Sequence, residues 1–478
     1  MTTTPAPRAD PRTDWPPTSQ TTGPTGSRPG LLTLDELRAL AVSGRITTVR
    51  LALPDMQGRL KGKDYPAGHF IQHIADSGAE FCGYLLATDV DMRPVDGYAL
   101  ASWQTGYGDL TVRPDLTTIR HLPWMPRTAM VLADAFHSEG LPVEVSPRRM
   151  LRRQLDQLAA RGITGAVGLE AEFVLYRGTA AEAEQTGYRN LHPVTGHNID
   201  YALDHPRPLR RFLRELPIAL AGADLPLESV KTEGAAGQVE VTFRYGDPMK
   251  AADAHLLLKQ AVKVVAERQE MAPTFMAAPA TGVGSGLHVH LSLWREGEAL
   301  FADVDGQLSP LAHQVIGGLL DAMPHLALLY APTVNAYKRY AARSFAPTYL
   351  TWGYDNRTCA VRVVGHGDGL HLEVRFPGAD ANPYLALTAI LAAAQHGIDH
   401  DLDPGKPYTG DAYQAPDETR IHPRALEEAL ECFDGVTLAA ELLTDEVVRH
   451  YARAAEIEIE THRRHVTDLD RQRGFSRT

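Results

Sequence analysis

This chain of 478 residues has few cysteines, no long apolar run and no excess of positive charge. Its three cysteines, Cys82, Cys359 and Cys432, lie far apart and form no Cys-x-x-Cys pair. This usage excludes a disulfide-stabilised secreted fold and predicts a reducing, cytoplasmic location. No segment approaches the roughly 20 apolar residues of a membrane helix, and the polar N-terminus has no signal-peptide core, so we expect no membrane contact.

The charge balance also limits the partners. The chain carries 47 basic and 59 acidic residues, a net charge of −12. Because phosphate backbones bind basic faces, we expect no nucleic-acid partner. Against this background, the segment "NAYKRYAARSFAPTYLTWGYDNR" (335–357) concentrates cations among aromatic residues. A local basic cluster in an acidic protein predicts a site for a small anionic ligand.

The length and the order of the predicted elements indicate more than one domain and an α+β fold. Residues 1–30, rich in Pro and Thr, are expected to form a disordered tail. Residues 31–142 form a first domain, and a helix introduced by Ser146 and Pro147 opens a second domain over 143–478. In the second domain we predict strands over 165–176, 237–244, 286–294, 358–365 and 370–376, and helices over 206–222, 249–271, 309–330, 382–396, 424–432 and 443–470.

Polar side chains recur at alternate positions of the predicted strands, which places them on one face of a sheet. Three strands show this spacing: Glu170 and Glu172; His288, His290 and Ser292; Glu373 and Arg375. In a fourth group, Glu233 and Glu240 bracket a Gly-containing loop. Each segment taken alone also fits a half-exposed strand or a surface hairpin.

Taken together, five carboxylates and a histidine would repel one another unless cations lay between them. Hard divalent ions such as Mg²⁺ or Mn²⁺ suit ligand sets rich in carboxylates with an occasional imidazole. Two metal ions beside several arginines are typical of phosphoryl transfer, because both neutralise the charge on the transferred group.

Six segments, in this order and spacing, resemble the glutamine synthetase superfamily: "GLEAEFVLY", "EGAAGQVEV", "GSGLHVHLSL", "NAYKRY", "NRTCAVR" and "LEVRFPGADANPYLA". The resemblance covers nearly the whole chain after the tail. It implies an N-terminal β-grasp domain over 31–142 and a catalytic domain with a curved antiparallel sheet over 143–478. It also implies a homo-oligomer of stacked rings, a dodecamer in the family, with active sites between neighbouring subunits.

The resemblance further implies a role for each matching residue. One metal site would consist of Glu172, Glu233 and Glu240, and the other of Glu170, His288 and Glu373. The remaining matches would bind substrates: His290 and Ser292 would contact ATP, Arg357 and Arg362 the transferring phosphate, Arg339 and Arg375 the carboxylates of glutamate, and Gly284 the same substrate. In the implied reaction, ATP phosphorylates the γ-carboxylate of glutamate, and an amine nitrogen then displaces phosphate.

Two departures from the family pattern concern the incoming nitrogen. Members that use ammonia carry acidic residues at the places of Phe345 and, in "FCGYLLATD", of Cys82. Without them we expect a primary amine, a polyamine or an ethanolamine-type amine, with Phe345 and Cys82 lining its pocket, as in the γ-glutamylamine synthetases of the family. The alternative for Phe345 is a packed aromatic residue under a loop. A polyamine would need further acidic groups, for which Glu80, Asp89 and Asp91 are candidates.

Two other functions stay open at this stage. One is an authentic glutamine synthetase that uses ammonium, and the other is an inactive, nitrogen-sensing homologue. The complete set of metal ligands and arginines opposes the second. Tyr413 falls near a tyrosine that some family members adenylylate, but an ordinary tyrosine in a surface loop is the favoured interpretation.

Overall fold

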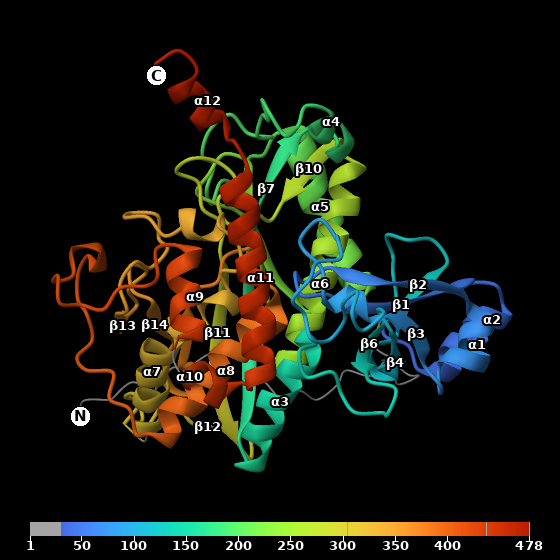
Figure 1. The fold of residues 1–478 in the computed structure, drawn as a ribbon, viewed down its shortest axis with the longest axis horizontal. Helices are drawn as coiled ribbons and strands as arrows, with labels where there is room; N and C mark the ends of the chain where they lie inside the picture. Colours follow the sequence, from blue (N-terminus) through green and yellow to red (C-terminus); the bar gives the residue numbers. More distant parts are fainter. Residues whose placement is uncertain (1–29, 304, 436, 478) are drawn as a thin grey trace, which may run out of the picture.

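The computed structural model describes residues 30–303, 305–435 and 437–477, and it contains two β-sheets with helices around them (Figure 1). This mixed architecture confirms the predicted α+β class. Except for Gly30, the predicted disordered tail lies outside the described residues. Within these described ranges, we find no helix that combines the length and apolar character needed to cross a lipid bilayer.

The smaller sheet lies in the N-terminal part and has the strand order β2-β1-β6-β4-β3, with β5 paired to β6. Its strands and flanking helices are β1 (Thr48–Pro54), β2 (Leu60–Pro66), β3 (Ala79–Cys82), β4 (Asp109–Pro114), β5 (Arg120–His121), β6 (Thr128–Phe136), α1 (Leu34–Val42) and α2 (Ala67–His69). Thr33 and Glu36 form a capping box that begins α1, as their three-residue spacing favours.

The larger sheet has the order β13-β14-β15-β11-β7-β9-β8, with β10 beside β7 and β12 beside β11. All neighbours are antiparallel except β13 and β14. The strands are β7 (Thr164–Arg177), β8 (Leu227–Thr232), β9 (Gln238–Phe243), β10 (Met271–Thr274), β11 (Leu287–Arg295), β12 (Glu298–Ala299), β13 (Trp352–Tyr354), β14 (Val361–Val364) and β15 (His371–Val374).

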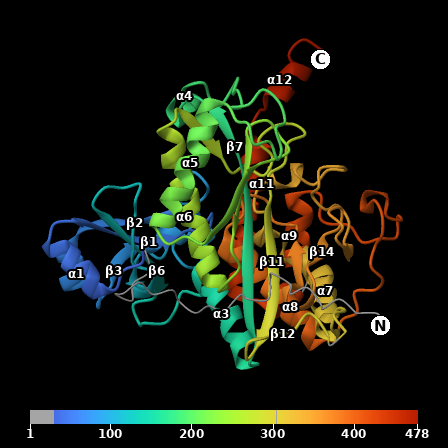
Figure 2. The ribbon, with the colours of Figure 1, turned by 180° about the vertical axis from the view of Figure 1, so that it is seen from behind.

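The two faces of the larger sheet differ in what covers them. Leu287, Val289 and Leu291 of β11 are fully buried and point to the face that the helices cover. Figure 2 shows β7 and β11 from the other side, where no helix lies over them. Side chains at the intervening positions of these strands therefore point to the face that these helices do not cover, and several of them, including Glu172, His288 and Ser292, are nonetheless buried.

Helices pack behind the sheet, with α8 at their centre. Every residue of α8 from Pro383 to Gly397 is buried, and this helix packs against α7, α3 and α6. The helices of this part are α3 (Pro147–Ala160), α4 (Ala180–Gln185), α5 (Arg207–Gly222), α6 (Pro248–Glu267), α7 (Pro310–Ala322), α8 (Pro383–Asp399), α9 (Leu426–Asp434), α10 (Thr437–Leu442), α11 (Asp445–Arg464) and α12 (Asp468–Gly474).

Several predicted boundaries were wrong. The helix predicted over 249–271 ends at Glu267, and Glu270, with a φ of 55°, turns the chain into β10. The helix predicted over 309–330 tightens at Met323, next to Pro324, into a 3₁₀ segment. The helix predicted over 443–470 breaks at His465, which is extended, before α12 begins.

A buried ion cluster joins the smaller sheet to the helices. Arg148, in the first turn of α3, lies 3.1 Å from the Asp253 carboxylate of α6 and 2.9 Å from that of Asp134 on β6. A third carboxylate, Asp115, lies 2.9 Å away, and the Tyr384 hydroxyl donates to Asp253. One guanidinium therefore balances the charge of carboxylates from the smaller sheet and its loops and from α6, and it helps to fix the contact between that sheet and the helices.

We expect Arg148→Met to lower the free energy of unfolding by about 3–5 kcal/mol, because it leaves the buried Asp253 carboxylate without a cation. Arg152→Met is the matched control, since Arg152 lies on the same helix but is far more exposed than Arg148, and its contact with Asp115 is long, at 3.9 Å. We expect its free energy of unfolding to change by less than about 1 kcal/mol. Urea unfolding of both variants measures the difference. Equal midpoints would show that the cluster is energetically neutral.

Candidate active site

The register of the central strands brings five of the six predicted metal ligands together on the face of the sheet opposite the helices. Antiparallel pairing sets Glu172 opposite Glu240 of β9, and Glu170 opposite His288 of β11. On the far side of β11, His290 lies opposite Glu373 of β15. Directly opposed residues point to the same face. The sheet therefore assembles the site from strands that lie far apart in the sequence.

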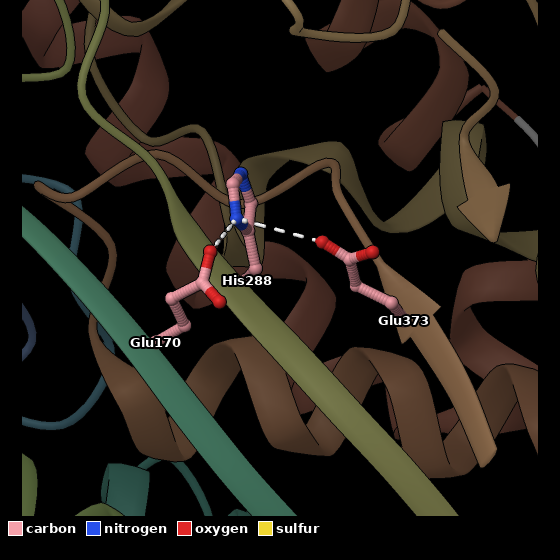
Figure 3. A group of neighbouring side chains, drawn as sticks. All are labelled: Glu170, His288 and Glu373. Atoms are coloured by element: carbon pink, nitrogen blue, oxygen red, sulfur yellow. Dashed lines mark hydrogen bonds and ion pairs between the residues drawn. The ribbon is translucent and has the colours of Figure 1, made fainter. Parts of the chain in front are cut away.

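Glu170, His288 and Glu373 form the first metal-ligand group (Figure 3). Nδ1 of His288 lies 2.6 Å from Oε1 of Glu170 and 3.6 Å from Oε1 of Glu373. One ligand atom from each residue lies within 4.8 Å of the others. The structure thus brings together all three members of one predicted metal site.

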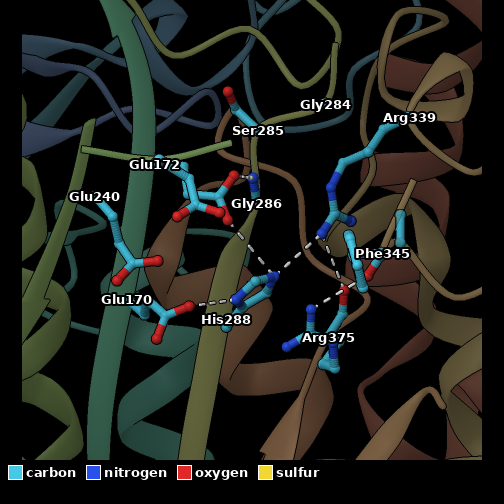
Figure 4. Close-up of polar contacts among 12 residues, drawn as sticks. Glu170, Glu172, Glu240, Gly284, Ser285, Gly286, His288, Arg339, Phe345 and Arg375 are labelled. Atoms are coloured by element: carbon cyan, nitrogen blue, oxygen red, sulfur yellow. Dashed lines mark hydrogen bonds and ion pairs between the residues drawn. The ribbon is translucent and has the colours of Figure 1, made fainter. Parts of the chain in front are cut away.

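Glu170, Glu172 and Glu240 form the second group, so that Glu170 belongs to both (Figure 4). Among the residues that the structure describes, neither group includes the predicted ligand Glu233. Its carboxylate pairs instead with the ammonium of Lys231, which also lies 3.5 Å from Glu240 and 3.4 Å from Asp200. Lys231 was missed in the sequence, although its position two residues before Glu233 places both on one face of the chain.

The electrostatics of the two groups differ. Burial and the nearby Glu170 carboxylate raise the pKa of Glu240 to about 8. Burial also disfavours the charged form of Glu373, but Arg375 and His288 outweigh it and lower the pKa of Glu373 to about 2. Burial likewise opposes the charged form of Glu170, yet hydrogen bonds from His288 and His290 hold its pKa far below the usual range.

This donor set fits divalent cations. Three buried or half-buried carboxylates face one another in the second group, and such a cluster is stable only when protons or cations neutralise it. Carboxylate oxygens with one imidazole are the ligands that Mg²⁺ and Mn²⁺ accept. The residues present therefore fit one ion in each group.

A glycine-containing loop lies beside the second group. The backbone N–H of Gly286 donates to Glu172 over 2.9 Å, and the side chain of Gln238 donates to Glu172 and to the Gly284 carbonyl. A Cβ atom at Gly286 would lie 2.7 Å from Nε2 of His288 and 2.8 Å from Nη2 of Arg339, so a larger residue there would have to displace these two side chains. Gln238 is a site residue that the sequence analysis missed, although it lies two residues before Glu240.

Two predicted glutamate-binding arginines, Arg339 and Arg375, lie buried next to the first metal-ligand group. Arg339 donates to the Phe376 carbonyl over 2.9 Å, and its Nη2 lies 3.5 Å from Nε2 of His288. Arg375 pairs with Glu373 and donates to the Phe345 carbonyl over 3.2 Å. Their cationic groups therefore stand between the metal ligands and the loop that carries Phe345 (Figure 4).

His290 and Ser292, predicted to contact ATP, lie further along β11, whereas the predicted phosphate ligands Arg362 and Arg357 lie on β14 and on the turn before it. Nη1 of Arg362 lies 2.8 Å from Glu373, whereas Arg357 is exposed on the turn before β14. The Trp294 indole donates to Ser292 over 2.8 Å. His290 lies 3.6 Å from Glu170. This group thus extends from the metal ligands toward the end of β11.

Phe345 and Cys82 are placed very differently. Phe345 is 59% exposed, so a packed aromatic residue, the alternative considered for it, does not describe it within one chain. Cys82 lies on β3 of the smaller sheet, where its thiol contacts the Tyr107 carbonyl. Glu80 is on the same strand, and Asp89 and Asp91 lie in the following turn. Within one chain, the larger sheet holds the metal ligands and the smaller sheet holds Cys82.

Known proteins resemble this chain over most of its length. The family model described as "Glutamine synthetase, catalytic domain" matches residues 144–474. A gamma-glutamylethanolamide synthetase, GlnA4, of Streptomyces coelicolor is 43% identical and covers 95% of this chain and 98% of its own. A glutamate–isopropylamine ligase of a Pseudomonas species is 34% identical, and the match covers 87% of this chain and 92% of the relative. The solved structure "GmaS/ADP complex-Conformation 1" superposes with a TM-score of 0.78 at 29% identity, covering 92% and 99%.

The raised pKa of Glu240 predicts how metal binding depends on pH. From its ordinary pKa of 4.5 up to about 8, the folded protein keeps a proton at Glu240 that the unfolded chain has released, so the stability from this group falls as pH rises through that window. A metal ion must displace that proton. We therefore expect the apparent affinity for Mn²⁺ to rise up to roughly tenfold per pH unit between pH 6 and 8.

Calorimetric titration with Mn²⁺, together with the Tm with and without the ion, measures this effect. In Glu240→Gln, which has no proton to displace at this position, we expect the pH dependence of Mn²⁺ binding to flatten between pH 6 and 8. An unchanged slope in this variant would assign the titration to another group.

Proposed function

The chain belongs to the glutamine synthetase family, and we propose that it is an ATP-dependent ligase that joins the γ-carboxylate of glutamate to a small primary amine. The amine we favour is of the ethanolamine type. The observation that carries this choice is Phe345, an exposed aromatic side chain next to Arg375, at the place where ammonia-using members of the family carry a glutamate.

The side chain at this position decides which nucleophile is favoured. A carboxylate attracts ammonium through its charge and can accept a proton from it as a general base. A phenyl ring offers no charge and instead supplies apolar contact to the carbon chain of an alkylamine. The relatives described as a gamma-glutamylethanolamide synthetase and as a glutamate–isopropylamine ligase support a small amine over a long polyamine.

Arginine side chains carry the first half of the reaction. Arg339 and Arg375 are buried and cationic, and we assign them to the carboxylates of glutamate. Arg362, held by Glu373, and Arg357 on its exposed turn are assigned to the phosphoryl group that leaves ATP for the γ-carboxylate oxygen. When bound, the divalent ions of the two metal-ligand groups supply further positive charge to the phosphate oxygens.

The second half of the reaction forms the amide. A free carboxylate is a poor acyl donor because its oxygen leaves poorly, and phosphorylation turns that oxygen into part of a good leaving group. The nitrogen lone pair of the amine then attacks the carbonyl carbon of the acyl phosphate, the bond from that carbon to the phosphate oxygen breaks, and phosphate leaves. The nitrogen gives up a proton, which the released phosphate can accept. The role of Phe345 in this step is to orient the amine and to exclude water beside the acyl group.

The proposal is tested by phosphate release from ATP and glutamate with a panel of ammonium, ethanolamine, isopropylamine, putrescine and spermidine. We expect the highest kcat/KM with ethanolamine or isopropylamine. Turnover with ammonium alone would make the protein a glutamine synthetase in activity, and a preference for spermidine would replace the small amine by a polyamine. Absence of turnover with ammonium and with every amine would favour the alternative of an inactive, nitrogen-sensing homologue.

Phe345→Glu should raise the ratio of kcat/KM for ammonium to that for ethanolamine by roughly tenfold or more, because the new carboxylate attracts the smaller cation and removes the apolar contact. Phe345→Gln is the matched control, since it has the same shape as glutamate without the charge. We expect it to weaken turnover with ethanolamine without improving turnover with ammonium. Equal ratios in all three proteins would show that position 345 does not select the nucleophile.

A further inference from the structure

The loop that carries Phe345 has an unusual backbone. Arg343 and Phe345 have φ angles of 63° and 59°, which lie in the left-handed region that residues with a Cβ atom rarely adopt. Such a conformation persists only where the surrounding structure holds it. The contacts that hold residues 343–346, hereafter the amine loop, therefore decide where the ring of Phe345 points.

Two side chains from outside the amine loop hold its backbone. Arg375 donates to the carbonyl of Phe345 over 3.2 Å, and the hydroxyl of Tyr413 donates to the carbonyl of Ala346 over 2.9 Å. Within the loop, the N–H of Ala346 donates to the hydroxyl of Ser344 over 3.2 Å. Hydrogen bonds thus hold the main chain of Phe345 and of the next residue, Ala346, while the ring of Phe345 stays exposed.

Tyr413 is itself anchored. It lies in a short 3₁₀ turn, where the Asp411 carboxylate accepts from its N–H over 3.0 Å. The preceding N–H, of Ala412, donates to the Thr358 hydroxyl over 2.9 Å, and the Asn356 amide donates to the Gly410 carbonyl over 2.9 Å. The segment is therefore attached to the turn that carries Arg357.

This placement corrects the interpretation of Tyr413 as an ordinary residue of a surface loop. Its side chain is half-buried, and burial raises the pKa of the phenol above its ordinary value. The hydroxyl therefore keeps its proton at neutral pH and acts as a donor. Its acceptor is a main-chain carbonyl directly after the residue that we assign to amine selection.

We propose that Tyr413 is a positioning residue for the amine pocket: its hydroxyl holds the backbone of the amine loop so that Phe345 presents its ring to the alkyl part of the amine. This inference rests on the proposed function. Tyr413 contacts the amine loop and not the metal ligands, so its loss acts on the amine and leaves ATP and glutamate binding largely intact. A purely structural role would instead lower the Tm and disturb all three substrates together.

Tyr413→Phe removes the hydrogen bond and keeps the ring. In the presence of saturating ATP and glutamate, we expect the KM for the preferred amine to rise roughly three- to tenfold, the range expected for one hydrogen bond. We expect the KM for ATP and for glutamate to change less than about twofold. Tyr408→Phe is the matched control, because the Tyr408 hydroxyl lies in the same segment and reaches only the Asp411 carbonyl over 3.4 Å.

Two measurements test whether Tyr413 acts through the amine loop. In a Phe345→Ala background, Tyr413→Phe should no longer change the KM for the amine, as a double-mutant cycle shows. Hydrogen exchange of the amine-loop amides should be faster in Tyr413→Phe than in the wild type. This second readout does not depend on turnover.

The outcomes separate the inference from the proposed function. A wild type that uses ammonium alone overturns both. A wild type that prefers an alkylamine, with a Tyr413→Phe variant whose KM for the amine and loop exchange are unchanged, overturns only the role of Tyr413. Equal rises in the KM for all three substrates also overturn it. A selective rise in the KM for the amine that vanishes in the Phe345→Ala background establishes it.

Discussion

The contact between Glu170 and His288 across strands β7 and β11 is the interaction on which the site depends. Glu170 belongs to both metal-ligand groups, so its position sets the distance between the two ions that they would hold. His288 in turn faces Glu373 and Arg339, and through Glu373 the charge balance continues to Arg375 and to the loop of Phe345. One cross-strand pair thus links cation binding to the region of the nucleophile.

The carboxylates near this pair are balanced in different ways. Arg362 and Arg375 pair with the almost fully buried Glu373, whereas Lys231 lies beside Glu233 and Glu240. The arginine forks match carboxylates geometrically, and the lysine provides a more compact, flexible charge. The first group therefore has permanent cationic partners, and the second relies on a lysine, a proton on Glu240 or a metal ion.

Alternation of polar and apolar residues in the sequence was sufficient to predict which side chains share a face, and the order of the predicted elements was sufficient for the α+β class. Five of the six predicted metal ligands lie together in the two groups. The pairing of β7 with β11 and of β11 with β15 brought Glu170, His288 and Glu373 together, as predicted, and the pairing of β7 with β9 set Glu172 opposite Glu240. The lysine near Glu233, the amide of Gln238 and the hydroxyl of Tyr413 were not assigned in this way. Lys231 lies two residues before its partner Glu233, and that spacing was overlooked. The partners of Gln238 and Tyr413 lie on other segments, so the sequence gives no signal of those contacts. Helix ends at Glu267 and His465 were missed for a similar reason, because local propensity continues beyond the point where the chain turns.

The hydrogen bonds that Arg375 and Tyr413 make to the amine loop end on main-chain carbonyls, not on side chains. Every amino acid has such a carbonyl, so the frame of the loop does not depend on which side chain residue 345 carries. Under the proposed role of Phe345, a substitution at this position changes the contact offered to the nucleophile while the hydrogen bonds that hold the loop stay in place. Substrate choice can then shift without rebuilding the sheet.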